Sequence, residues 1–267
     1  MAFERNEYPK KRTIHTTKPV DKTREKELVF GTQPVIEALK AGQEIDKIIV
    51  FREQSFSDIL EMAIERGIPV QRVPMEKLNQ ITRKNHQGVI AFVSAIRYVS
   101  LHNILAGIFE KGEVPLLLML DRITDVRNFG AIARSAECMG VHAIVVPMRG
   151  AAQINSDAIK TSSGALSHLP VCRENNLMDT VQYLQDSGVQ VIACTEKAAQ
   201  ILTNVDFTTP TAIIMGSEED GVSPELIRRS NMNIKIPMKG KVASLNVSVA
   251  AGMVIYEAAR QRMQEVI

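Results

Sequence analysis

The chain has 267 residues, of which 45% are hydrophobic and 23% are charged, and its formal net charge is +2. This length leaves room for two domains with cores of their own, and the composition is that of a soluble globular protein. No apolar run approaches the roughly 20 residues that span a bilayer, so no membrane-spanning helix is expected. The nearly neutral charge gives no overall sign of a nucleic-acid partner.

The first 27 residues are polar and basic, with eight Lys or Arg residues against five acidic ones. A segment with almost no large apolar side chains cannot order itself by burial, so we expect a flexible arm at 1–27. It is either a solvated tail or a phosphate-contacting element. It lacks the apolar stretch of a secretory signal. Together with three widely spaced cysteines and no C-x-x-C pair, this indicates a reducing, cytoplasmic setting.

Residues 28–97 alternate short apolar strands with helical stretches. Strands are predicted at 47–51, 69–73 and 88–94, and helices at 35–39, 57–66 and 75–81. This β-α-β-α-β pattern predicts a small α/β domain of its own. Residues 98–114 then favour a helical linker that ends near Gly112 and Pro115.

From residue 115 to 267 the rhythm changes to strands separated by longer helices. Strands are predicted at 116–120, 143–147, 190–195, 211–216 and 233–238, and helices at 129–139, 155–163, 177–187, 223–230 and 246–264. Nearly continuous apolar strands linked by helices indicate a mostly parallel sheet that is covered on both faces. The fold class is therefore α/β.

Three polar segments each follow a predicted strand of this second region. They are Asn128–Arg134, Gly216–Gly221 and Ser244–Ala250. Ligand sites in α/β proteins form outside the carboxyl ends of strands, where backbone amides and helix starts are exposed. We therefore expect one polar pocket that is built from distant parts of the sequence.

The common enzyme signatures are missing. No G-x-G-x-x-G follows a strand, and neither a P-loop nor a G-x-S-x-G elbow is present, which argues against dinucleotide binding, P-loop phosphoryl transfer and an α/β-hydrolase. The five histidines are scattered without metal-ligand spacing and are expected to be structural. The adjacent acids Glu218, Glu219 and Asp220 cannot all face one ion, so no metal is expected.

Several polar residues of these segments allow two interpretations. Asn128 is either the N-cap of the following helix or a site residue, and Ser244 and Asn246 have the same two options before the last helix. Arg134 is either a surface residue or, on a helix that looks buried, a cation that needs Glu218 or a substrate phosphate as its partner.

Apolar residues of the last segment also recur at helical spacing. They are Leu245, Val249, Met253 and Tyr256, and we expect them to lie in the core.

In order, the patterns Asn128-x-Gly-x-x-x-Arg134, Gly216-x-Glu218-x-x-Gly221 and Ser244-Leu-Asn246-Val resemble the three motifs of the SpoU (TrmH) family. These are RNA ribose 2′-O-methyltransferases of the SPOUT class that use S-adenosyl-L-methionine. The resemblance covers about 150 residues, from Leu116 to Arg262.

The first region resembles a domain that precedes the catalytic domain in some members. Phe30-Gly31, Pro34, Ala38-Leu39 and His86-Gln87-Gly88 match the small ribosomal-protein-like RNA-binding domain of those enzymes. This layout is most similar to the bacterial members that methylate a guanosine ribose in 23S ribosomal RNA.

The resemblance implies a trefoil knot tied by the C-terminal segment, although knots are nearly absent from other proteins. It also implies a homodimer and an RNA substrate, with no metal and no membrane. It assigns the catalytic positions to Asn128, Arg134, Glu218, Ser244 and Asn246, and cofactor binding to the backbone around Gly216, Ile236 and Leu245. Because a guanidinium stays protonated, Arg134 is better suited to bind phosphate or lower the pKa of the hydroxyl than to act as a base.

Three alternatives remain open at this point. The first is a transfer-RNA ribose methyltransferase of the same family. The second is a non-catalytic RNA-binding or ribosome-assembly factor that keeps the fold, which the intact motif residues disfavour. The third is a generic nucleotide-binding α/β protein.

Overall fold

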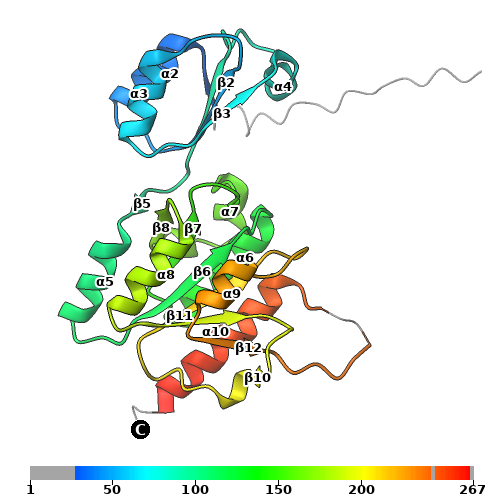
Figure 1. Ribbon diagram of the computed structural model, residues 1–267. Coiled ribbons are helices and arrows are strands. Elements are labelled where there is room, and N and C mark those ends of the chain that lie inside the picture. Colours follow the sequence, from blue (N-terminus) through cyan, green and yellow to red (C-terminus); the bar gives the residue numbers. More distant parts are fainter. Residues whose placement is uncertain (1–27, 242–243, 265–267) are drawn as a thin grey trace, which may run out of the picture.

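The computed structural model describes residues 28–241 and 244–264, which form two α/β domains (Figure 1). The expected arm at 1–27 lies outside these residues. Within the described part of the chain, no helix is long and apolar enough to cross a lipid bilayer. Below, the small domain is the part from residue 28 to 94, and the large domain begins at residue 95.

The small domain is built on a sheet with the strand order β1-β4-β2-β3. Its strands are β1 (Leu28–Phe30), β2 (Ile45–Phe51), β3 (Val70–Val73) and β4 (Val89–Val93). β2 pairs antiparallel with β4 and parallel with β3. Helices α2 (Thr32–Lys40) and α3 (Ser57–Glu65) cover one face and α4 (Met75–Ile81) the other. The predicted alternation of strands and helices is confirmed.

The large domain contains a second sheet, ordered β10-β12-β9-β11-β6-β7-β8-β5 within the described residues, and every pairing in it is parallel. Its strands are β5 (Tyr98–Val99), β6 (Leu116–Asp121), β7 (Ala143–Pro147), β8 (Val171–Glu174), β9 (Gln190–Cys194), β10 (Gln200–Ile201), β11 (Thr211–Gly216) and β12 (Met232–Lys235). The parallel sheet is confirmed. The sequence missed β5 and β10, which have two residues each and show no pattern, and β8, half of which is the charged pair Arg173 and Glu174.

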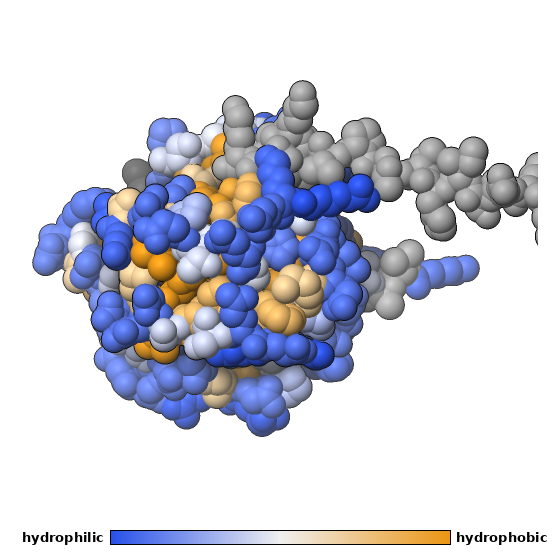
Figure 2. Space-filling model, turned by 90° about the horizontal axis from the view of Figure 1, so that it is seen from above, coloured by the Kyte–Doolittle hydropathy of each residue, from blue (hydrophilic) through white to orange (hydrophobic). Residues whose placement is uncertain are grey.

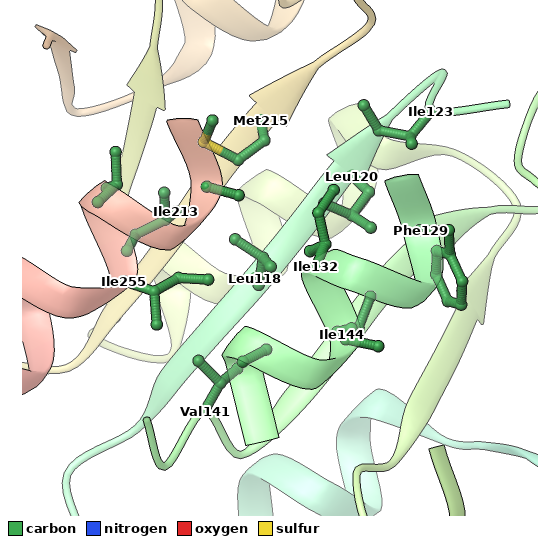
Figure 3. Packing of buried hydrophobic residues seen from close by; sticks show 14 of the residues in the cluster. Leu118, Leu120, Ile123, Phe129, Ile132, Val141, Ile144, Ile213, Met215 and Ile255 are labelled. Carbon is green, nitrogen blue, oxygen red and sulfur yellow. The ribbon is translucent and has the colours of Figure 1, made fainter. Parts of the chain in front are cut away.

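Helices cover both faces of this sheet. On one face lie α6 (Val126–Cys138), α7 (Ser156–Thr161) and α10 (Val247–Gln264), and on the other α5 (Leu101–Glu110), α8 (Leu177–Asp186) and α9 (Pro224–Arg229). Successive strand residues point to opposite faces, so Leu118 packs under α6 and α10 while Leu117 packs under α5 and α8. Figure 3 shows Ile132 of α6 and Ile255 of α10 closing over Leu118.

The segment expected to be a linker, 98–114, does contain a helix, but it is integrated into the large domain. β5 extends the sheet beside β8, and α5 buries Leu101, Leu105 and Ile108 against it. The burial of these side chains holds the segment to the large domain. The segment that connects the two domains is therefore only a few residues long, near 95–97.

A polar group with side chains from β2, β5 and β8 joins the two domains. The Tyr98 hydroxyl donates to Asp46 Oδ1 of the small domain at 2.7 Å. Arg173 Nη1 donates to the carbonyls of Ile45 and Asp46 at 3.3 Å each, and its guanidinium lies 4.1 Å from the centre of the Tyr98 ring. We call Asp46, Tyr98 and Arg173 the inter-domain cluster. Burial raises the pKa of the Asp46 carboxyl, and the hydrogen bond from Tyr98 opposes this rise.

Candidate active site

Three side chains from the three polar segments meet in one hydrogen-bonded group. Asn128 Nδ2 donates to Glu218 Oε1 at 2.5 Å, and Asn246 Nδ2 donates to the same oxygen at 3.0 Å and to Asn128 Oδ1 at 3.1 Å. We call Asn128, Glu218 and Asn246 the amide–carboxylate trio. The expectation that the three segments form one pocket is met for these residues, although they are 90 and 28 positions apart in sequence.

Asn128 is placed by the first turn of α6. The helix begins at Val126, and Asp125 is its N-cap: Asp125 Oδ1 accepts from the backbone N–H groups of Arg127 and Asn128 at 2.8 Å each. The interpretation of Asn128 as the N-cap is therefore wrong. Its amide is instead available to hold Glu218.

Asn246 has both of the roles between which the sequence left a choice. Its Oδ1 accepts from the Ser248 backbone N–H at 2.9 Å, which caps α10, and from the Ser248 hydroxyl at 2.6 Å. Its Nδ2 is then directed to Glu218 and Asn128. The helix start thus orients the amide, and one side chain serves both stability and the site.

The turn that carries Glu218 is braced by the residues that follow β6. Arg122 donates to Asp220 Oδ2 and to the Gly221 carbonyl, both at 3.0 Å, and its guanidinium also pairs with Asp121 at 3.2 Å. Asp121 Oδ2 accepts from the Ser223 backbone N–H at 2.7 Å. Arg122 has a φ of 58°, an uncommon value for a non-glycine residue. These bonds fix the Glu218 turn against the end of the neighbouring strand.

Gly216 is required by the close return of the same turn. A Cβ built on it would lie 2.0 Å from the backbone of Gly221 and Val222, which no side chain tolerates. The Ser217–Gly221 bridge and the Gly221 N–H to Ser217 carbonyl bond of 2.9 Å close this turn.

Next to the trio lies a cavity of about 530 Å³, which we call the cofactor cavity. Five of the residues that the sequence singled out line it, namely Gly216, Glu218, Ile236, Ser244 and Leu245. Its other walls include the Cys194–Lys197 turn after β9 and the side chains of Met215 and Met238. Burial raises the pKa of the Cys194 thiol to about 11, so this wall presents a neutral thiol rather than a nucleophile.

The chemistry of this cavity fits S-adenosyl-L-methionine. Methionine, isoleucine and leucine side chains offer apolar contact to an adenine ring and a thioether chain, while the glycine-containing turns expose backbone groups that hydrogen-bond polar edges. The volume lies within the range of small-ligand sites.

Of the two interpretations of Arg134, the structure agrees with the surface residue. Its side chain is exposed, so it does not require an internal anionic partner, and no ion pair with Glu218 is present among the described residues. It also does not line the cofactor cavity. A buried arginine paired to Glu218 is therefore excluded among the described residues.

The apolar repeat near the C-terminus is also not core. Val249, Met253 and Tyr256 of α10 are 53%, 44% and 57% exposed, and Leu245 before the helix is 39% exposed. The periodicity was real, but these residues form an apolar stripe on the outer side of α10. The residues that face the core are others of the same helix, among them Ala251, Val254 and Ile255.

Several residues that build the site were missed in the sequence. Asp121 and Arg122 brace the Glu218 turn, Asp125 caps α6, and Thr195 and Glu196 line the cofactor cavity. The rule that sites form at strand carboxyl ends could have drawn attention to them, because each follows β6 or β9. Among the described residues, no group of three or more His, Cys, Asp or Glu is placed to hold a metal ion.

Comparison with known proteins agrees with this geometry. Residues 115–256 match the model of the SpoU rRNA methylase family, and residues 28–99 match that of an RNA 2′-O ribose methyltransferase substrate-binding domain. The chain is 37% identical over 237 residues to YacO of Bacillus subtilis strain 168, which is named as a TrmH family tRNA/rRNA methyltransferase; the match covers 88% of this chain and 95% of YacO. The chain belongs to the SpoU (TrmH) family.

Two solved structures extend the comparison. The SpoU methyltransferase AviRb of Streptomyces viridochromogenes, in complex with the cofactor AdoMet, has a TM-score of 0.57 at 28% identity and covers 89% of this chain and 90% of its own. A TrmH/SpoU tRNA modifying enzyme of A. aeolicus has a TM-score of 0.54 at 30% identity, but the match covers 58% of this chain and 78% of that one. This SpoU family member is therefore an RNA 2′-O-ribose methyltransferase, and its cofactor is S-adenosyl-L-methionine.

Proposed function

We propose that this SpoU family member methylates the ribose of a guanosine in 23S ribosomal RNA. The two-domain layout supports this: the match to the tRNA modifying enzyme covers 58% of the chain, a share too small to span both domains. The matching family model is that of an rRNA methylase, and the small domain matches a substrate-binding model. A large structured RNA is a substrate for which a separate binding domain has a use.

Two hollows lie on either side of Glu218 at the carboxyl ends of the large sheet, and this arrangement supports methyl transfer to a ribose. The cofactor cavity lies at the carboxyl ends of β9, β11 and β12, and the trio lies where β11 meets β6. A smaller hollow of about 260 Å³ on the other side of Glu218 is lined by Asn128 and Thr124. A methyl donor on one side of the trio and a ribose on the other would meet at Glu218, which lines both hollows.

Glu218 is the residue placed to handle the hydroxyl proton. Its Oε1 is held by two amide donors, and no hydrogen bond to Oε2 is present among the described residues. Bound cofactor supplies an electrophilic methyl group on a sulfonium. We assign to Glu218 Oε2 the hydrogen bond that aligns the ribose 2′-hydroxyl and the acceptance of its proton. The hydroxyl oxygen would gain the methyl group as the bond between that methyl and the sulfonium sulfur breaks and the cofactor leaves as a neutral thioether. Ser244, at the wall of the cavity, and Arg134 are assigned to positioning the RNA and its phosphate.

The proposal includes a homodimer that forms through the stripe on α10. Apolar side chains that are about half exposed at helical spacing mark an interaction surface. Gly252 of this helix packs near the Ser135 hydroxyl, so Arg134 belongs to the neighbouring helix at this face. A second copy seated here would bring its own RNA within reach of Arg134.

Met253→Glu should convert the dimer to a monomer in sedimentation, whereas Met238→Glu, which is outside the helix, should not. The trefoil knot stays a prediction.

Methyl transfer from tritiated donor to purified RNA tests the function. We expect incorporation into 23S rRNA and, after digestion, 2′-O-methylguanosine as the labelled nucleoside, with none in 16S rRNA or tRNA. Label in tRNA would favour the tRNA alternative. Absence of label in any RNA or ribosomal particle would contradict the proposed function.

A further inference from the structure

We propose that the groove between the two domains holds one or two unpaired nucleotides of the RNA next to the methylated one. This rests on the proposed function and adds a second, separate binding place to it. The groove has a volume of about 680 Å³, and both domains line it. We call it the inter-domain groove.

The groove continues the active site along the edge of the large sheet. Its large-domain wall comes mainly from the segments at the ends of β6 and β7 and from Arg173 of β8, and these strands follow the trio in the order of the sheet. Thr124 lines both this groove and the hollow beside Asn128 and Glu218. The two hollows are therefore neighbours at Thr124, so an RNA strand bound at the trio can continue toward the groove. Figure 2 looks at the end of the molecule that carries the small domain, where the surface is mostly polar with a band of apolar residues.

The charges that line the groove favour a polyanion. Arg173 is occupied by the inter-domain cluster, and Asp46 is buried there, so neither is free for a ligand. The cations that remain are Arg149, which is exposed with no ion pair among the described residues, and Lys47, whose Nζ lies 4.7 Å from the centre of the Phe92 ring. They come from opposite domains. Two cations on facing walls are suited to successive phosphates.

Polar side chains of the groove favour an exposed base edge. Gln71 of the small domain and Gln153 of the large domain both line it, and no hydrogen bond of either side-chain amide is present among the described residues. An amide offers a donor and an acceptor, which is what the edge of an unpaired base requires. Pro147 and Met148 also line the groove and offer apolar contact to a base.

The size of the groove selects single-stranded RNA. Its volume is that of a small-molecule site and is too small for a double helix. Sequence-specific RNA recognition uses bases that are splayed out of the stack, and an enzyme that reaches a 2′-hydroxyl at a closed site needs its nucleotide unstacked as well. The hydrogen bonds of the inter-domain cluster, whose residues line the groove, connect its two walls.

The test measures the affinity of the full-length protein for a labelled single-stranded RNA hexamer of mixed sequence. Arg149→Ala should weaken binding about fivefold to tenfold and reduce the salt dependence by about one phosphate contact, while Gln71→Ala weakens binding about threefold with an unchanged salt slope. The matched control is Lys111→Ala. Lys111 is exposed and precedes β6, so it lies near the amino ends of the strands. Its replacement by Ala should leave the hexamer affinity and the salt slope unchanged. Cofactor affinity and melting temperature should stay at the wild-type value in all three.

A second measurement keeps the proposal open to refutation. An RNA that carries 4-thiouridine beside the target should crosslink to residues 147–153 or 69–71. Unchanged hexamer affinity in both groove variants, or crosslinks confined to other surfaces, would overturn the groove while methyl transfer continued. Wild-type protein that binds cofactor but methylates no RNA would instead contradict the proposed function.

Discussion

The amide–carboxylate trio and the inter-domain cluster have a similar arrangement of residues, but the first is proposed to act in methyl transfer and the second connects the two domains. Each places a carboxylate from one chain segment among donors from two others. Glu218 is exposed, whereas Asp46 is 8% exposed and burial raises its pKa. The carboxyl whose pKa is raised is the one that lies between the domains, and a shifted pKa is only a probabilistic sign of function.

The largest effect should follow from changing the exposed carboxylate. Glu218→Gln keeps an oxygen for the two amide donors but removes the second acceptor, so methylation should fall by about 100-fold or more. Cofactor affinity and melting temperature should be nearly unchanged. Glu219→Gln, one residue along the same turn, is the control and should stay within about threefold. A similar loss in both variants would contradict the assignment.

Arg134→Ala should come next, with methylation reduced by about 100-fold because a charged contact to RNA is lost. Arg134 does not line the cofactor cavity, so cofactor affinity should be retained. If cofactor affinity fell as much as the rate, Arg134 would not be a residue that acts on RNA. Co-expression with Glu218→Gln tests whether it acts across the dimer: restored activity in about a quarter of the sites would show that it does.

A moderate effect on stability, and little on chemistry, is expected from the inter-domain cluster. Tyr98→Phe removes the hydroxyl that donates to Asp46 and leaves a buried carboxylate oxygen unpaired. The free energy of unfolding should fall by about 1–3 kcal/mol, measured by denaturant titration. The maximal rate of methylation at saturating RNA should stay within about threefold. Tyr183→Phe, on α8 and away from the cluster, serves as the control. If Tyr98→Phe lowered the rate of methylation as much as Glu218→Gln does, the inter-domain cluster would not be a purely structural group.

The smallest effect should be a pH dependence of stability from His142. Burial lowers its pKa below 6.5, and its Nδ1 accepts from the Leu116 backbone N–H at 3.0 Å. Below a pH of about 6.5 the unfolded chain binds a proton that the folded chain excludes, so the free energy of unfolding should decrease as the pH falls through that range. His142→Gln should flatten this slope in thermal melts from pH 7.5 to 5. An unchanged slope would place its origin elsewhere.

Much of the architecture could be predicted from the chain alone. The apolar runs at 116–120 and 211–216 are buried parallel strands, and the ordered motifs pointed to the trio and to the cofactor cavity. Short elements were missed because a strand of two residues, such as β5, carries no periodicity. The start of α6 was placed late because the capping Asp125 was overlooked beside the more conspicuous Asn128.

What the sequence determined by itself is the set of local preferences: which segments are strands, where helices are capped, and which residue types follow each strand. Tertiary structure decided which of those residues meet. A period of 3.6 places Val249, Met253 and Tyr256 on one side of α10, but only packing tells whether that side faces the core or the exterior. Similarly, Arg122 reaches Asp220 across 98 positions because β6 and β11 are neighbours, and strand order is a property of the whole sheet rather than of any segment.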